Sequence, residues 1–408
     1  MHHGPPKKAR RHVDDLRGAS RLAIDATRGV TGLVEAMHTT IASGPTILGR
    51  PLAVPAQLVN QLVYASIRGV TRLVGDALDV ALAQLAPLLG SSVPGGEREA
   101  VIAALNGVLG DHLAEHDNPL ALAMQLRHRG EPLELSPGGL RRALPQAGRK
   151  LVVLVHGLCM TDGQWMRRGH DHGAALARDL GYTPVYAFYN SGLHVSTNGH
   201  ALAAQLEQLI ATWPVPLDDL VILGHSMGGL VARSACHAAE QAGHAWRPRL
   251  RSLIALGSPH HGAPLERRGH RLDLVLGITP YTAPFRSLGR IRSAGITDLR
   301  FGNVLDEHWR DADRFAHHGD RRSALALPVG VACYAIAGTL APIAADRLPG
   351  DGLVPVASAL GVHRDPALTL VFPDAHRFVA VATGHLDLLS SRAVYATLRS
   401  WLDERRDP

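Results

Sequence analysis

A serine set between two glycines is the strongest chemical signal in the sequence. The segment reads Gly224-His225-Ser226-Met227-Gly228, and it lies between an apolar run at residues 220–223 and an amphipathic, helical pattern. Gly-x-Ser-x-Gly between a buried strand and a helix is typical of a nucleophile elbow, a strained turn that lifts the serine hydroxyl above the sheet. The alternative is a glycine-rich turn with an incidental serine. The flanking elements favour Ser226 as a nucleophile.

A serine hydroxyl needs a general base, and that base needs an orienting carboxylate. In this kind of site they follow in the chain order serine, acid, histidine. Asp351 lies between two glycines after a strand predicted to end near Ala337, and His385 lies after a strand predicted at residues 368–372. The order predicts a catalytic triad of Ser226, Asp351 and His385.

Other acids and histidines compete for these roles, because the chain contains 24 histidines. His376 lies closer to the end of the last predicted strand, and His363 precedes that strand. Asp346 competes with Asp351, and Asp387 could serve as a carboxylate placed after the histidine. Chain order and loop context favour Asp351 and His385.

Acyl transfer also needs hydrogen-bond donors for the oxyanion of a tetrahedral intermediate. One donor is expected to be the backbone N–H of Met227, where the start of a helix also supplies partial positive charge. The other is expected to be the N–H of Leu158, in the segment Val155-His156-Gly157-Leu158 after the first buried strand. His156 is then expected to be structural, and not the catalytic base.

These residues must be positioned by a sheet. Continuous apolar runs are typical of parallel strands buried on both faces; they occur at residues 151–155, 184–188, 220–223, 253–256, 331–337 and 368–372. Apolar residues at helical spacing lie between them, with a helix expected to start from a cap at Thr197 or Asn198. The alternation predicts an α/β fold with a mainly parallel sheet flanked by helices. In such sheets, catalytic groups gather at the carboxyl ends of the strands.

The five motifs of the second half form an ordered set. They are His156-Gly157-Leu158, Gly224-His225-Ser226-Met227-Gly228-Gly229, Gly257-Ser258-Pro259-His260-His261-Gly262, Asp351-Gly352-Leu353-Val354-Pro355 and Gly384-His385-Leu386-Asp387. Together they resemble those of bacterial triacylglycerol lipases and carboxylesterases and of the related GPI inositol-deacylase-like hydrolases, over about residues 150–402. The resemblance implies an α/β-hydrolase fold with a nucleophile at Ser226, an acid at Asp351 and a base at His385. It also implies oxyanion donors at Leu158 and Met227, and it permits cleavage of synthetic polyesters.

The chain divides by pattern into three parts. Residues 1–12 are expected to be a disordered basic tail, residues 13–145 a helical N-terminal region, and residues 146–408 an α/β-hydrolase catalytic domain. An insertion at residues 262–327 is too long for a structureless loop, so we expect a helical lid. Leu276 and Phe285 are its predicted substrate-binding residues, because its apolar side chains must pack on the domain or line a pocket. The segment 189–194 could also line the acyl pocket, with an ordinary surface loop as the alternative.

Composition narrows the function further. With 46% hydrophobic and 19% charged residues the chain is expected to fold as a globular protein. The basic run Lys7-Lys8-Ala9-Arg10-Arg11 has no interleaved aromatics, so no nucleic-acid partner is expected. The pairs His260-His261 and His317-His318 have no third ligand at a useful spacing, so neither a metal nor any other cofactor is predicted.

Three cysteines cannot make a disulfide framework, and neither a secretory signal nor a spanning segment is recognised, which favours a cytoplasmic protein. Peripheral membrane contact stays open.

The leading hypothesis is a serine-dependent hydrolase that cleaves small-molecule or lipid-like carboxylic esters through an acyl-enzyme. An acyltransferase or thioesterase would use the same triad. A third alternative is a hydrolase-fold scaffold that binds a partner or a membrane surface through its N-terminal helices. A scaffold has no need of all three catalytic groups, and this disfavours it.

Overall fold

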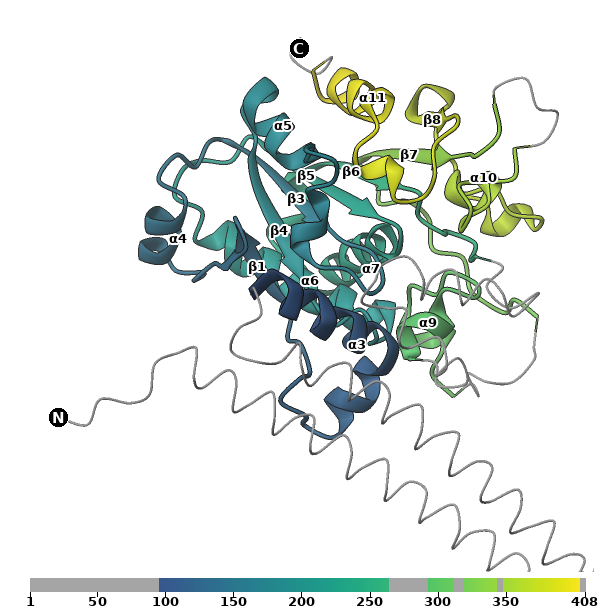
Figure 1. The fold of residues 1–408 in the computed structure, drawn as a ribbon, viewed down its shortest axis with the longest axis horizontal. Coiled ribbons are helices and arrows are strands. Elements are labelled where there is room, and N and C mark those ends of the chain that lie inside the picture. Colours follow the sequence, from purple (N-terminus) through teal and green to yellow (C-terminus); the bar gives the residue numbers. More distant parts are fainter. Residues whose placement is uncertain (1–94, 264–292, 312–318, 343–347, 404–408) are drawn as a thin grey trace, which may run out of the picture.

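The computed structural model describes residues 95–263, 293–311, 319–342 and 348–403, and all that follows concerns these residues. They form one mostly parallel sheet of eight strands with helices on both faces (Figure 1). The strand order is β2-β1-β4-β3-β5-β6-β7-β8. In chain order, the strands are β1 (Gln125–His128), β2 (Glu131–Pro132), β3 (Lys150–Val155), β4 (Thr183–Phe188), β5 (Asp219–His225), β6 (Leu250–Leu256), β7 (Ala332–Gly338) and β8 (Arg377–Ala380).

Helices cover the sheet on both sides. They are α3 (Gly95–Glu115), α4 (Pro137–Ala143), α5 (His172–Leu180), α6 (Val195–Ala211), α7 (Met227–Ala242), α9 (Ala294–Asp298), α10 (Val356–Ala359) and α11 (Arg392–Asp403). Single 3-10 turns occur at Asp162–Trp165, Arg247–Arg249, Asp306–His308, Pro366–Leu368, Asp374–His376 and Asp387–Leu389. None of the helices within the described ranges combines the length and apolar character needed to cross a membrane.

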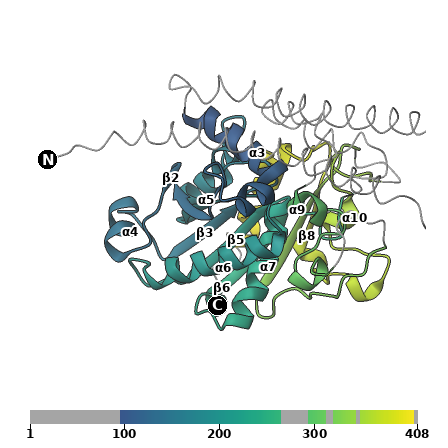
Figure 2. The ribbon, with the colours of Figure 1, turned by 90° about the horizontal axis from the view of Figure 1, so that it is seen from below.

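The strand β3 shows how the two hydrophobic layers form. Successive side chains of a strand point to opposite faces. Leu151, Val153 and Val155 therefore join the core with α3, α6 and α7, whereas Val152 and Leu154 join the core with α5 and α11 (Figures 1 and 2). A strand buried on both faces must be apolar at every position, which explains the continuous runs in the sequence.

Parallel pairing aligns the carboxyl ends of the central strands. Val155 of β3 lies opposite Gly224 of β5, and Gly224 lies opposite Ala255 of β6. Beyond them, β7 and β8 continue the parallel part of the sheet, while β1 runs antiparallel to β4. The loops that leave β3, β5, β6, β7 and β8 therefore emerge along one edge.

Five of the six predicted strands are confirmed, but the prediction of a strand at residues 368–372 is wrong. Leu370 and Phe372 are buried in the core, whereas Val371 between them is 83% exposed and no strand pairs with them. These two residues pack on the core from a loop, and the alternation of buried and exposed side chains resembles the pattern of a strand. The last strand is instead β8, which is too short and begins with too polar a residue, Arg377, to give an apolar run.

The start predicted for the helix after β4 is also corrected. The helix α6 begins at Val195 with His194 as its N-cap, not at Thr197 or Asn198. The carboxylate of Asp298 accepts the Val195 N–H at 2.8 Å, and its Oδ2 lies 3.0 Å from His194 Nδ1. A capping group from more than 100 residues away leaves no local signal in the sequence.

The N-terminal region is only partly helical where it is described. Helices α3 and α4 agree with the expectation, but β1 and β2 are strands that extend the sheet beyond β4. At four and two residues they are too short to show a periodicity. The apolar residues of α3 share the core of β3, so residues 95–145 pack as part of the sheet domain. The basic tail and residues 13–94 lie outside the described residues.

The insertion at residues 262–327 is described at 262–263, 293–311 and 319–327, where it contains the short helix α9. Leu276 and Phe285, with the apolar patch around them, lie outside the described residues. Their predicted role in substrate binding stays a prediction.

Candidate active site

The turn after β5 holds Ser226 in a backbone conformation that is rare for a residue with a side chain, with φ 54° and ψ −125°. Neighbouring backbone leaves no room for side chains at the flanking glycines. A Cβ at Gly224 would lie 2.5 Å from the N atom of Gly229, and one at Gly228 would lie 2.1 Å from the carbonyl oxygen of Val155. The tight strand-to-helix turn at Ser226 therefore requires the two glycines of the sequence Gly-x-Ser-x-Gly.

Asp351 and His385 form a buried pair in the loops after β7 and β8. His385 Nδ1 lies 2.7 Å from Asp351 Oδ2, and the two side chains are only 6% and 1% exposed. Asp351 Oδ1 accepts the N–H groups of Leu353 at 3.0 Å and Val354 at 2.8 Å. The N–H of His385 donates to the Asp351 carbonyl at 3.0 Å, which ties the two loops together.

This setting keeps the carboxylate of Asp351 charged. Burial alone would raise the pKa of Asp351, but the charge and hydrogen bond of His385 and the two backbone N–H donors outweigh it and lower that pKa. A carboxylate next to Nδ1 fixes the tautomer of His385 that carries its proton there. The other ring nitrogen, Nε2, is then left as a base.

Ser226 and His385 line one cavity at the carboxyl edge of the sheet. Its remaining described walls are almost entirely apolar and come from five loops; they include Leu158, Met160, Pro259, Ala263, Leu299, Leu353, Val354 and Leu386. An apolar, partly enclosed space beside a nucleophile and a base suits a substrate with an apolar group next to its reacting atom.

The loop after β3 runs directly over the serine. A Cβ at Gly157 would lie 3.0 Å from the Cβ of Ser226, so a side chain there would crowd the serine. The next residue, Leu158, lines the cavity. Neither its N–H nor that of Met227 donates a hydrogen bond to any residue of the described ranges. Two N–H groups beside the serine nucleophile are what a developing oxyanion requires.

His225 supports the histidine loop, a role that the sequence did not suggest. It is fully buried, and its Nε2 donates to the carbonyl oxygen of His385 at 3.1 Å. Burial and the neighbouring charge of His385 lower the pKa of His225 to about 3, so its ring is neutral. His225 occupies the unrestricted position x of the Gly-x-Ser motif, so the motif gave no direct signal for this role.

The competing histidines and acids lie elsewhere or have other partners. His376 precedes β8, at the opposite edge of the parallel strands from Ser226, and its Nδ1 lies 3.1 Å from the Cys333 carbonyl oxygen. Asp387 forms ion pairs with Arg167 at 3.3 Å and Arg168 at 3.0 Å.

His363 lies 3.6 Å from Asp320, with its ring 4.9 Å from that of His261. His156 is buried and stacked on Tyr189, and burial lowers the pKa of His156 to about 4, in keeping with a structural role. Asp346 lies outside the described residues.

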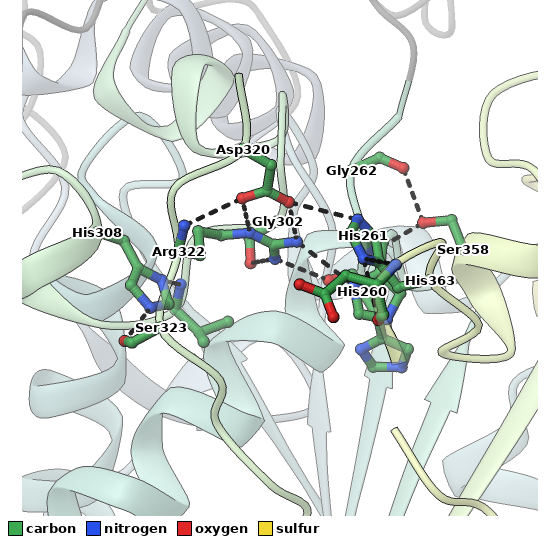
Figure 3. Close-up of polar contacts among 12 residues, drawn as sticks. His260, His261, Gly262, Gly302, His308, Asp320, Arg322, Ser323, Ser358 and His363 are labelled. Atoms are coloured by element: carbon green, nitrogen blue, oxygen red, sulfur yellow. Dashed lines mark hydrogen bonds and ion pairs between the residues drawn. The ribbon is translucent and has the colours of Figure 1, made fainter. Parts of the chain in front are cut away.

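The loop after β6 is held by a buried arginine (Figure 3). Arg322 donates to the carbonyl oxygens of His260 at 3.1 Å and Gly302 at 2.9 Å, and it pairs with Asp320 at 2.8 Å. Ser358 donates to the carbonyl oxygen of Gly262 at 2.7 Å from the other side. This polar cluster fixes the loop that supplies two walls of the cavity.

No group of three or more His, Cys, Asp or Glu within the described ranges is arranged to hold a metal ion. His260 is fully buried, and burial together with the charge of Arg233 lowers its pKa well below the usual value. His261 Nε2 donates a hydrogen bond to the Gly361 carbonyl oxygen at 2.9 Å. The pair His317-His318 lies outside the described residues.

The strand order, the strained serine turn after β5 and the acid and histidine loops after β7 and β8 define the α/β-hydrolase fold. This is the α/β-hydrolase fold that the ordered motifs predicted. Residues 147–325 match the family described as "PGAP1-like alpha/beta domain". No curated protein matches the chain.

Several solved structures are similar to the chain at low identity. The mature form of the lipase BlEst2 from Bacillus licheniformis is 17% identical, with a TM-score of 0.41 over 68% of this chain and 97% of the lipase. The naproxen esterase (carboxylesterase NP) of Bacillus subtilis is 15% identical, with a TM-score of 0.36 over 64% and 84%. RedJ-thioesterase from the prodiginine pathway of Streptomyces coelicolor is 19% identical, with a TM-score of 0.34 over 64% and 92%. At these values the likeness assigns neither an activity nor a substrate.

Proposed function

We propose that the protein is a carboxylic-ester hydrolase with a triad of Ser226, His385 and Asp351. The observation that carries the proposal is the buried pair of His385 and Asp351, 2.7 Å apart, in which His385 lines one cavity with a serine on a strained turn. A paired acid and histidine beside such a serine is the arrangement that turns a weak hydroxyl into a nucleophile.

The reaction follows from these groups. Ser226 Oγ attacks the acyl carbon while His385 Nε2 takes the hydroxyl proton, and the carbonyl oxygen becomes an oxyanion that accepts the N–H groups of Leu158 and Met227. The C–O bond to the alcohol then breaks, and His385 returns the proton to the leaving alkoxide. Water attacks the acyl-enzyme with His385 again as base. The bond from the acyl carbon to Ser226 Oγ then breaks, His385 returns its proton to Oγ, and the carboxylic acid leaves; Asp351 stays ionised throughout and stabilises the imidazolium.

The cavity favours an apolar acyl group, because its described walls beyond the catalytic residues are mostly aliphatic. We therefore propose small-molecule or lipid-like esters as substrates, with polyesters open to the same test. The insertion at residues 262–327 acts as a cap that supplies Ala263 and Leu299 to the wall. Leu276 and Phe285 remain its predicted substrate-binding residues.

The decisive experiment combines a probe with a substrate panel. A fluorophosphonate should label Ser226, and Ser226→Ala should remove labelling and lower kcat by a factor on the order of 10⁶ while the protein stays folded. The panel compares p-nitrophenyl esters with thioesters of equal acyl length, each with water alone and with an added alcohol. Preferential thioester cleavage or acyl transfer to the alcohol would favour the alternatives that use the same triad. Labelling of another serine would overturn the assignment.

A further inference from the structure

The helix α3 precedes every residue of the proposed triad, yet it lies directly against the loop that follows β3. At Gly107 the two segments are so close that a Cβ would lie 2.2 Å from Cys159 Sγ and 2.9 Å from Cys159 Cα. The Sγ of Cys159 also lies 3.8 Å from the carbonyl oxygen of Ala104, one turn earlier in the helix. The helix therefore forms a fixed wall behind the residue next to Leu158.

Cys159 is held in a conformation that it would not adopt freely. Its φ is 58°, in the left-handed region that costs energy for a residue with a side chain. Its N–H donates to the hydroxyl of Ser191 at 2.9 Å, and Ser191 is 1% exposed. Strain of this kind persists only where the surroundings enforce it, and here they fix the peptide that follows Leu158.

The loop that carries Ser191 is itself fastened to α3. Asn190 Nδ2 donates to the carbonyl oxygen of Gly110 at 2.8 Å, and a Cβ at Gly192 would lie 2.1 Å from the carbonyl oxygen of Asn106. One helix thus touches the β3 loop directly and also supports the hydroxyl that holds it.

The same helix fixes the start of α9, which lies beside it (Figure 2). Ser293 donates to the carbonyl oxygen of Gly107 at 2.6 Å, and the Ala294 N–H donates to Asp111 Oδ2 at 3.0 Å. Since α9 leads into Leu299 of the cavity wall, α3 supports two sides of the site.

We propose that α3 positions the oxyanion donor of Leu158 through the contact of Gly107 with Cys159 and through Ser191. The inference rests on the proposed function, because it assigns a geometric requirement to the same reaction. Gly107 and Ser191 are positioning residues that touch no substrate. A displaced Leu158 N–H weakens binding of the developing oxyanion and leaves the ground-state fit of the ester unchanged.

The test compares Gly107→Ala with Gly96→Ala in the full chain. Both changes lie in α3 and raise its helix propensity, but a Cβ at Gly96 meets nothing within 4 Å. Activity is measured per active site, after fluorophosphonate titration to completion. For Gly107→Ala we expect kcat to fall at least about tenfold with KM within about twofold, because loss of a whole oxyanion donor costs about 10² to 10³ in kcat. Gly96→Ala should match the wild type.

Two further measurements separate positioning from simple damage. The Ki of an alkyl trifluoromethyl ketone, which forms a tetrahedral adduct with serine, should rise by the factor by which kcat/KM falls. Adding Cys159→Ala to Gly107→Ala removes the 2.2 Å contact and should recover part of the loss. If Gly107→Ala does not fold, Ser191→Ala provides the same readouts, since it removes only the acceptor of the Cys159 N–H.

The outcomes are distinct. Unchanged kcat and Ki per labelled site, in Gly107→Ala or in Ser191→Ala, would overturn this inference and leave the proposed function intact. A variant in which fewer sites are labelled, but each labelled site keeps wild-type kcat, would also overturn it, because α3 would then affect folding alone. Wild-type protein without Ser226-dependent ester hydrolysis would overturn the proposed function, and this inference with it.

Discussion

Asp351 Oδ2 lies 2.7 Å from His385 Nδ1, although the two residues follow different strands and are 34 positions apart. Three backbone hydrogen bonds fix this pair: two N–H groups donate to the other carboxylate oxygen, and the His385 N–H donates to the Asp351 carbonyl. The geometry therefore depends on both loops and not on the two side chains alone.

This pair gives the first prediction. Asp351→Asn should leave the fold intact but lower kcat by about 10⁴, since an amide holds the imidazole in the wrong tautomer. His385→Ala should cost at least as much. His376→Ala is the matched control because its ring lies at the other edge of the sheet, and it should keep kcat within about threefold of the wild type, a margin well below any triad effect. Steady-state kinetics on p-nitrophenyl butyrate provide the comparison, and a crippled His376→Ala variant would contradict the assignment.

Buried histidines give a second prediction, on stability against pH. Burial lowers the pKa of His156 and His172 to about 4 and that of His225 to about 3. As pH falls below about 6.5, these histidines bind protons in the unfolded chain but stay neutral in the folded chain. Their stabilising effect is therefore full above pH 6.5 and is lost progressively toward pH 3 to 4.

The effect is measurable by urea unfolding between pH 7.5 and 5. Each such histidine should contribute a slope of up to about 1.4 kcal/mol per pH unit to the free energy of unfolding. His172→Gln keeps a donor for the Leu388 carbonyl, which His172 Nε2 contacts at 2.9 Å, but removes the titration. This variant should show a flatter dependence on pH. An unchanged slope would mean that His172 titrates normally in the folded protein.

The residues of the candidate site were easier to locate in the sequence than the elements around them. Ser226 and the loop residues Asp351 and His385 sit in short glycine-marked motifs, because steric demands of the turns restrict the residue types there. The buried central strands could also be predicted, because each one is a continuous apolar run. The strand error at residues 368–372 arose because Leu370 and Phe372 alternate with an exposed residue while packing from a loop.

Long-range contacts explain what could not be predicted. The carboxylate that accepts the first N–H of α6 comes from Asp298, and the segment packed against Cys159 is α3; neither contact leaves a local pattern in the chain. The short strand β1 pairs with β4, which lies far along the chain, and β2 pairs only with β1. Tertiary context decided these elements.

The arginine cluster gives a third prediction. Arg322→Ala should lower the free energy of unfolding by about 3 to 5 kcal/mol, because it leaves Asp320 and two loop carbonyls without their buried partner. Arg310→Ala is the control, since it removes an exposed ion pair with Asp306, whose net value is about 0.5 kcal/mol or less. Chemical unfolding of both variants measures the difference. Equally small losses in the free energy of unfolding would show that the contacts of Arg322 do not stabilise the loop after β6.

The last prediction concerns Leu299, which is 4% exposed and lines the cavity beside Ser226. If the cavity receives an acyl chain, Leu299→Ser should reduce kcat/KM for hexanoate and octanoate esters more than for acetate. Each methylene that loses its apolar contact costs about 0.8 kcal/mol, close to a fourfold effect. Leu276→Ser and Phe285→Ser test the two other predicted residues of the cap in the same series.

The control for this series is Leu305→Ser, because Leu305 belongs to the same insertion and packs against the core but does not line the cavity. It should lower the melting temperature without changing the ratio of octanoate to acetate turnover. A loss for Leu299→Ser that is equal at all chain lengths, and that follows its melting temperature, would mean that Leu299 only packs on the core. Selective loss for long chains would instead place the acyl group against this wall, because only contacts made by the added methylenes change with chain length.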